Sequence, residues 1–237
     1  MAAFQSAILL LGIALGVGLS YAPNSGSDRV LKSATWWGSV GSDRQAEMGS
    51  MLFLSPAASL IMGVTLAFMM LGGVYWLSRM GWAWFSEIEA LLDQALVPSL
   101  RRCRIWQLLM LAILAGVGEE LLFRWAIQGW LEYFGRWAIV DVYYSQNTSR
   151  DFLNWLAYGF AATVTAILFG LCHAVTRAYW VLAAGMGLIF SLVVVAGGGL
   201  VAAIVAHGLY DFLAFMWLCQ RLEEKHGDGA ENEFMVG

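Results

Sequence analysis

The sequence predicts an all-α, polytopic membrane protein with about six transmembrane helices and one interfacial amphipathic helix. Two features of the composition indicate this class: 60% of the 237 residues are hydrophobic and only 13% are charged. Soluble domains contain about 25% charged residues. A third feature is that the apolar residues occur in runs long enough to cross a bilayer. The net charge of −4 argues against a nucleic-acid partner.

Six apolar runs are the predicted spans, and polar segments separate them. They cover residues 3–21, 51–77, 105–134, 152–175, 179–196 and 200–218. The first run lacks the positively charged start and the cleavage site of a signal peptide, so we expect a retained helix. The third is longer than the hydrocarbon core requires, so it must tilt, bend or protrude.

Residues 82–100 predict a different kind of helix. Apolar side chains such as Trp84, Ile88 and Leu92 alternate with acidic side chains at helical spacing, which is typical of a helix in the membrane interface. Three arginines follow within residues 101–104. Because a basic cluster beside a span marks a cytoplasmic edge, we expect both termini in the cytoplasm. The predicted location is a bacterial inner membrane or an organellar membrane.

The chain divides into three predicted parts. Residues 1–104 form an N-terminal two-span region with the amphipathic surface helix, and residues 105–218 form a core of four spans. Residues 219–237 form a polar, acidic tail, and the polar composition from residue 221 onward predicts disorder.

Charged residues in the third span are few and clustered. They are Glu119, Glu120, Arg124 and Glu132. Charge at this depth is rare and usually paired or functional. Glu120 precedes Arg124 by four residues, which favours an ion pair on one helix face. Glu119 points about 100° away around the axis. A carboxylate in apolar surroundings can act as a general base near neutral pH, so Glu119 is the candidate for chemistry. A purely structural polar cluster is the alternative.

Histidines in two later spans complete a candidate catalytic set with Glu119. His207 and Asp211 are four residues apart in the sixth span, so Asp211 can accept a hydrogen bond from the imidazole and favour its charged form. His173 lies near the end of the fourth span. A lone histidine in a membrane helix is more often a packing residue or a tetrapyrrole ligand. Three helices that each carry part of an acid, base and imidazole set instead favour a catalytic site.

These residues resemble the ordered motifs of a protease family, the CAAX protease and bacteriocin-processing family (CPBP, or Abi). The matching motifs are Glu119-Glu120-x-x-x-Arg124, Phe169-x-x-x-His173 and His207-x-x-x-Asp211. The resemblance covers residues 105–218. It implies an intramembrane endopeptidase, and the best-known members of the family cut prenylated CAAX proteins.

The resemblance also implies roles for the site residues. Glu119 and His173 would activate a water, and His207 and Asp211 would stabilise the oxyanion of the tetrahedral intermediate. This chain departs from the CAAX-cleaving pattern at Asp211, where those members have Asn. An ionised Asp cannot donate to an oxyanion, so Asp211 is either protonated or acts by holding His207 as imidazolium. A second departure is Trp125, where the family usually has Gly.

The function that we predict is hydrolysis of peptide bonds in membrane-associated substrates, lipidated ones included, with no cofactor. One alternative is a zinc-dependent membrane protease, because two Glu, two His and one Asp can supply ligands, although no H-E-x-x-H motif is present. The other alternative is a non-catalytic scaffold, immunity protein or accessory subunit. The predicted partners are the membrane, a membrane-associated peptide or protein, and, under the second alternative, a larger membrane protein complex.

Overall fold

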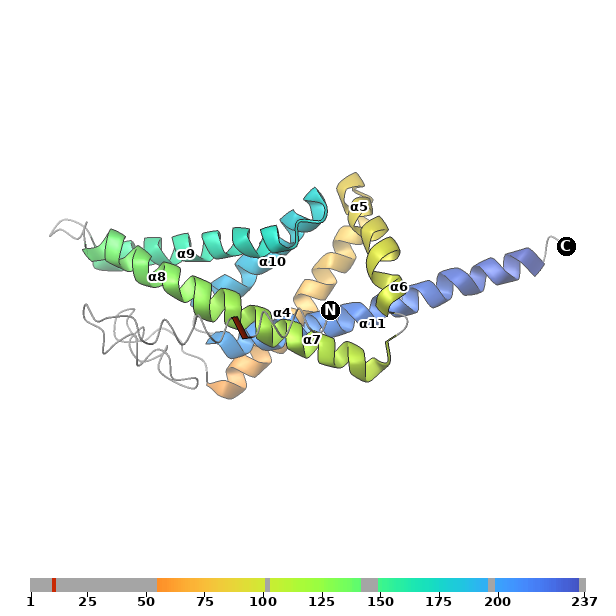
Figure 1. Ribbon diagram of the computed structural model, residues 1–237, viewed down its shortest axis with the longest axis horizontal. Helices are drawn as coiled ribbons and strands as arrows, with labels where there is room; N and C mark the ends of the chain where they lie inside the picture. The colour runs from red at the N-terminus through yellow and green to blue at the C-terminus, as the bar shows by residue number, and fades with distance from the viewer. Residues whose placement is uncertain (1–9, 12–54, 101–102, 142–148, 196–198, 235–237) are drawn as a thin grey trace.

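The computed structural model describes residues 10–11, 55–100, 103–141, 149–195 and 199–234 of the chain. Every element within these ranges is helical, which confirms the all-α prediction (Figure 1). The elements are α4 (Pro56–Arg79), α5 (Ala83–Leu91), the π-helix η1 (Leu92–Leu96), α6 (Val97–Leu100), α7 (Ile105–Glu120), the π-helix η2 (Leu121–Ile127), α8 (Gln128–Gly135), the π-helix η3 (Arg136–Asp141), α9 (Arg150–Cys172), α10 (Arg177–Val193) and α11 (Gly199–Phe234).

Four helices in the described ranges are long and apolar enough to cross a membrane. They are Pro56–Arg79, Ile105–Ile139, Phe152–Cys172 and Gly199–Gln220. The predicted fifth span corresponds to α10, which is apolar but only 17 residues long. The predicted first span lies outside the described residues except for Leu10 and Leu11, which are helical. The number of spans therefore stays a prediction.

Local capping sets where several of these helices begin. The side chains of Ser55, Ser149 and Thr176 each accept a hydrogen bond from a main-chain N–H of the first turn that follows. The cap at Thr176 separates α10 from α9, so the predicted fourth span ends at Cys172 rather than at residue 175. The short connection keeps His173 beside the first turn of α10.

The predicted amphipathic helix is observed as α5, η1 and α6, which descend steeply to α11 (Figure 1). Phe85 and Ile88 are buried and pack with Ala178 at the start of α10. The opposite face carries the exposed Glu87. A helix with one packed apolar face and one exposed face fits the surface position predicted from the sequence, and its location in the membrane interface stays a prediction.

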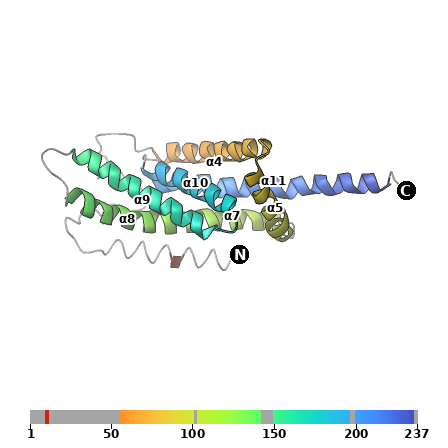
Figure 2. The ribbon, with the colours of Figure 1, turned by 90° about the horizontal axis from the view of Figure 1, so that it is seen from above.

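The prediction of a disordered tail from residue 221 is wrong as far as Phe234. Helix α11 continues to that residue and extends beyond the other helices (Figures 1 and 2). Extending an existing helix requires no new nucleus, and each added residue gains one hydrogen bond. The Leu-Glu-Glu-Lys sequence at residues 222–225 contains good helix formers. The polar composition alone therefore did not determine the local structure.

Close helix contacts position the site. Helix α11 packs on α4 and α7, and α9 packs on α8 and α10. Helices α7 and α11 cross where Gly116 faces Gly208. A methyl group added at Gly116 would lie 2.8 Å from the main-chain nitrogen of Gly208, so only glycine allows this approach. The crossing brings the last turn of α7, with both glutamates, against His207, the residue before Gly208.

Candidate active site

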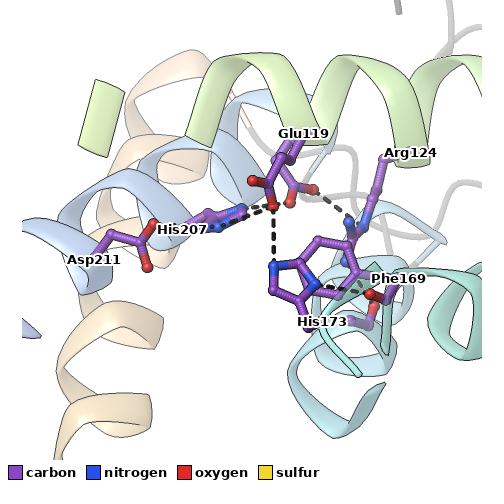
Figure 3. A network of polar contacts seen from close by, with 8 residues as sticks. Glu119, Arg124, Phe169, His173, His207 and Asp211 are labelled. Carbon is purple, nitrogen blue, oxygen red and sulfur yellow. Dashed lines mark hydrogen bonds and ion pairs between the residues drawn. The ribbon is translucent and has the colours of Figure 1, made fainter. Parts of the chain in front are cut away.

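The six residues predicted to form the site come together at one place. Glu119 and Glu120 lie in the last turn of α7, and Arg124 follows in η2. His173 caps the end of α9, and α11 supplies His207 and Asp211. Figure 3 shows the side chains of these three segments directed toward one another around Glu119. The site is therefore built from three segments that are far apart in the sequence.

Glu120 is the centre of a closed network of charges. Its Oε2 lies 3.1 Å from Nε of Arg124, and both side chains are fully buried. Its Oε1 accepts a hydrogen bond of 2.8 Å from Nδ1 of His207. One carboxylate thus contacts a guanidinium on its own helix and an imidazole on α11. Because the bond to Glu120 places the proton on Nδ1, it orients the other nitrogen, Nε2, away from Glu120.

Aromatic rings and a main-chain carbonyl hold Arg124. Its guanidinium lies 4.5 Å from the ring centre of Phe169 and 5.2 Å from that of Phe190. Nη2 donates a 3.0 Å hydrogen bond to the carbonyl of Gly187 on α10. Phe190 also stacks on His207, with ring centres 5.0 Å apart. These rings cover one side of the network with apolar surface, and electrostatic interactions are stronger in such low-dielectric surroundings.

Glu119 faces two histidines from two different helices. Its Oε2 lies 3.8 Å from Nε2 of His173 and 3.9 Å from Nε2 of His207 (Figure 3). Both distances exceed a direct hydrogen bond but allow one water molecule to contact the carboxylate and an imidazole. Glu119 itself is only 5% exposed. The arrangement can therefore hold and deprotonate a small nucleophile in a largely dry environment.

The orientation of His173 follows from its own helix. Nδ1 lies 2.8 Å from the carbonyl oxygen of Phe169, one turn earlier. Because a carbonyl only accepts hydrogen bonds, Nδ1 carries the proton, and Nε2 is directed at Glu119. The side chain of His173 is 26% exposed. His173 thus lies on the open side of the site.

Asp211 is further from His207 than the sequence spacing suggested. Its Oδ2 lies 3.5 Å from Nε2 of His207, whereas Glu120 bonds Nδ1 at 2.8 Å. From the sequence we expected Asp211 to orient the ring of His207, because Asp211 is one turn away on the same helix. In the structure, His207 is closer to Glu120 than to Asp211. Glu120 lies on another helix, α7, whose position relative to α11 cannot be derived from sequence spacing. Asp211 is 20% exposed and belongs to the open side with His173.

Gln128, and the four-residue repeat of polar residues along α7, η2 and α8 to which it belongs, were not recognised from the sequence. Gln128 donates a 3.0 Å hydrogen bond to Glu132, and both are buried, so the positions 120, 124, 128 and 132 repeat every four residues. In an α-helix each four-residue step rotates by about 40°. The π-helix η2 has more residues per turn and reverses this drift. The four-residue repeat is the sequence signal by which Gln128 could have been found. The repeat stays on one face because the π-helix offsets the rotation of the α-helical turns.

The arrangement of the candidate ligands bears on the zinc alternative. Among the residues that the structure describes, no group of three or more His, Cys, Asp or Glu side chains is arranged to hold a metal ion. Glu120, a ligand in the zinc alternative, is instead engaged by Arg124 and His207. Glu120 is therefore less available as a ligand, and both the absence of a cofactor and the zinc alternative stay predictions.

The fold and the site define a helical membrane protein with a buried centre of glutamates and histidines. Residues 101–213 match the family model for Rce1-like proteins, described as Type II CAAX prenyl endopeptidase Rce1-like. All six predicted site residues fall in this region. The match confirms the resemblance to the CAAX protease family and supports an intramembrane protease of that kind, in an integral membrane location. No curated protein and no solved structure matches the chain.

Proposed function

We propose that the chain hydrolyses peptide bonds of membrane-associated substrates, with a water activated by Glu119 and His173. The observation that carries this proposal is the position of Glu119, whose Oε2 lies within 3.9 Å of Nε2 of both histidines. A carboxylate that faces two imidazoles in a nearly dry site is suited to act as a general base. Glu120 is less suited, because it is already bound by Arg124 and His207.

The reaction begins with water held between Glu119 and His173. Glu119 takes one proton as the water oxygen attacks the substrate carbonyl carbon, which forms a tetrahedral intermediate with a negatively charged oxygen. When the C–N bond breaks, the proton passes from Glu119 to the leaving nitrogen. His173 lies on the open side, and its Nε2 can bind the water and then the leaving group.

His207 and Asp211 act on the oxyanion. Glu120 holds His207 through Nδ1, so Nε2 is left toward Glu119 and the reacting carbonyl. An N–H at this nitrogen would donate a hydrogen bond to the developing oxyanion. Such preorganised donors contribute strongly because they need no reorganisation during the reaction. Asp211, 3.5 Å from the same nitrogen, favours the protonated ring.

The substrate class follows from the surroundings of the site. Most of the site lies on helices that are long and apolar enough for a membrane, which supports a membrane-associated peptide as the substrate. The family description refers to a prenyl endopeptidase, and a prenylated peptide is therefore the first substrate to test.

The test is cleavage of a prenylated peptide by the purified chain in proteoliposomes. We expect the wild type to cleave and Glu119→Gln to lose turnover while it remains folded. The matched control is Glu87→Gln, the same chemical change at an exposed position of α5, which should cleave like the wild type. Full activity in Glu119→Gln would contradict the proposal, and loss of wild-type activity on chelation with recovery on adding zinc would favour the metal-dependent alternative.

A non-catalytic role remains the second candidate, and one observation favours it. The network of Glu120, Arg124 and His207 joins α7 and η2 to α11, and Arg124 also bonds α10, so it fixes helix packing without any chemistry. An inactive wild type that copurifies with one membrane protein, in a complex that survives Glu119→Gln, would support this role.

A further inference from the structure

Tyr179 stands beside the open side of the site, and neither the motifs nor the proposed mechanism uses it. It lies in the first turn of α10, where its main-chain N–H bonds the side chain of Thr176. Its ring meets the ring of His173 edge-on, with centres 6.1 Å apart and planes at 67°. The short connection between α9 and α10 therefore places a phenol next to the histidine that faces Glu119.

The ring of Tyr179 is held from outside by the surface helix. It packs on the cluster of Phe85 and Ile88 from α5 with Ala178 from α10. This packing leaves the ring few alternative orientations. A fixed ring can aim its hydroxyl group at one place, which is the requirement for a preorganised donor.

The hydroxyl of Tyr179 lies within electrostatic range of carboxylates in the site. Asp211 and Glu119, from two other helices, are the carboxylates that act electrostatically on it. Among the residues that the structure describes, none forms a hydrogen bond with this hydroxyl. A neutral O–H donor therefore lies within electrostatic range of Glu119, with its hydrogen-bonding capacity available to a bound substrate.

We propose that Tyr179 is a further catalytic residue, whose hydroxyl donates a hydrogen bond to the oxyanion of the tetrahedral intermediate. The inference rests on the proposed peptidase function. It also explains how the chain functions with Asp211 where the CAAX-cleaving members have Asn. A carboxylate only accepts hydrogen bonds, whereas an amide also donates. The phenol, beside His173, supplies a second donor that the carboxylate of Asp211 does not.

The experiment compares Tyr179→Phe with the wild type on the cleavable prenylated peptide. The substitution keeps the ring that packs on α5 and removes only the hydroxyl. Loss of one oxyanion donor lowers kcat by about 10²–10³-fold, so we expect a fall of that size with little change in KM or in thermal stability. The matched control is Tyr75→Phe on α4, where the exposed hydroxyl contacts Arg79, and it should keep full activity.

Four results would overturn the inference. Unchanged kcat in Tyr179→Phe, with an active wild type and an inactive Glu119→Gln, would reject Tyr179 and leave the proposed function intact. A raised KM together with lower thermal stability would show that the hydroxyl acts in packing. A loss of kcat in Tyr210→Phe but not in Tyr179→Phe would assign the donor to the neighbouring phenol on α11. An inactive wild type would reject the proposed function itself, and the inference with it.

Discussion

Two glutamates that are adjacent in the sequence lie in contrasting parts of one site. Glu120 is fully buried and bound by Arg124 and His207, whereas Glu119 faces His173 and His207 across distances near 4 Å. The partners on the Glu119 side, His173 and Asp211, are 26% and 20% exposed. One helical step of about 100° thus separates a closed network from an open one. The closed part fixes geometry, and the open part has two partly exposed side chains, those of His173 and Asp211, beside the buried Glu119.

The largest expected effect that separates the two parts is on stability. Glu120→Gln would leave the buried guanidinium of Arg124 without its carboxylate, and breaking a buried pair from one side costs about 3–5 kcal/mol. We expect a marked fall in the thermal denaturation temperature of the detergent-solubilised protein. Glu119→Gln, the matched change one residue earlier, should unfold close to the wild-type temperature. Equal stability of the two variants would remove the distinction between the closed and the open part.

The next effect concerns the helix crossing that brings both glutamates to His207. Gly116→Ala places a methyl group 2.8 Å from the Gly208 nitrogen, so α7 and α11 must separate. Overpacking typically costs about 1–3 kcal/mol of stability. We expect a marked fall in turnover while the protein stays folded, because the distances from Glu119 to the histidines change. Gly72→Ala on α4, where the added methyl meets nothing within 4 Å, is the control. Normal turnover in Gly116→Ala would show that the crossing can relax without disturbing the site.

The smallest effect is expected at Asp211. Glu120 bonds His207 at 2.8 Å and remains in Asp211→Asn, so the imidazole keeps its closer partner. The fall in kcat should therefore be smaller than the about 10²–10³-fold that loss of a donor typically causes. Measuring kcat of Asp211→Asn beside Tyr179→Phe on one peptide ranks the two residues. If kcat falls as far in Asp211→Asn as in Glu119→Gln, Asp211 rather than Glu120 is the residue that orients His207.

Some features of the site followed from the sequence because they depend on short separations. The pair of Glu120 and Arg124 spans one helical turn, and its geometry was predicted from a spacing of four. The helices that are long and apolar enough to span a membrane could be predicted from the apolar runs, because a bilayer requires such runs. The polar tail failed as a prediction, because a neighbouring membrane helix can extend into a segment whose own composition indicates disorder.

Other features were decided only by the tertiary structure. Glu120 and His207 are 87 residues apart, and their contact depends on the crossing of α7 and α11 at Gly116 and Gly208. Tyr179 follows no motif, and it meets His173 because a short capped connection joins α9 to α10 while α5 packs over the ring. The sequence determined which groups could carry charge within the membrane and which of them pair along one helix. Which carboxylate is enclosed and which faces the histidines was decided by helix packing, because contacts between helices depend on crossing points that no local spacing defines.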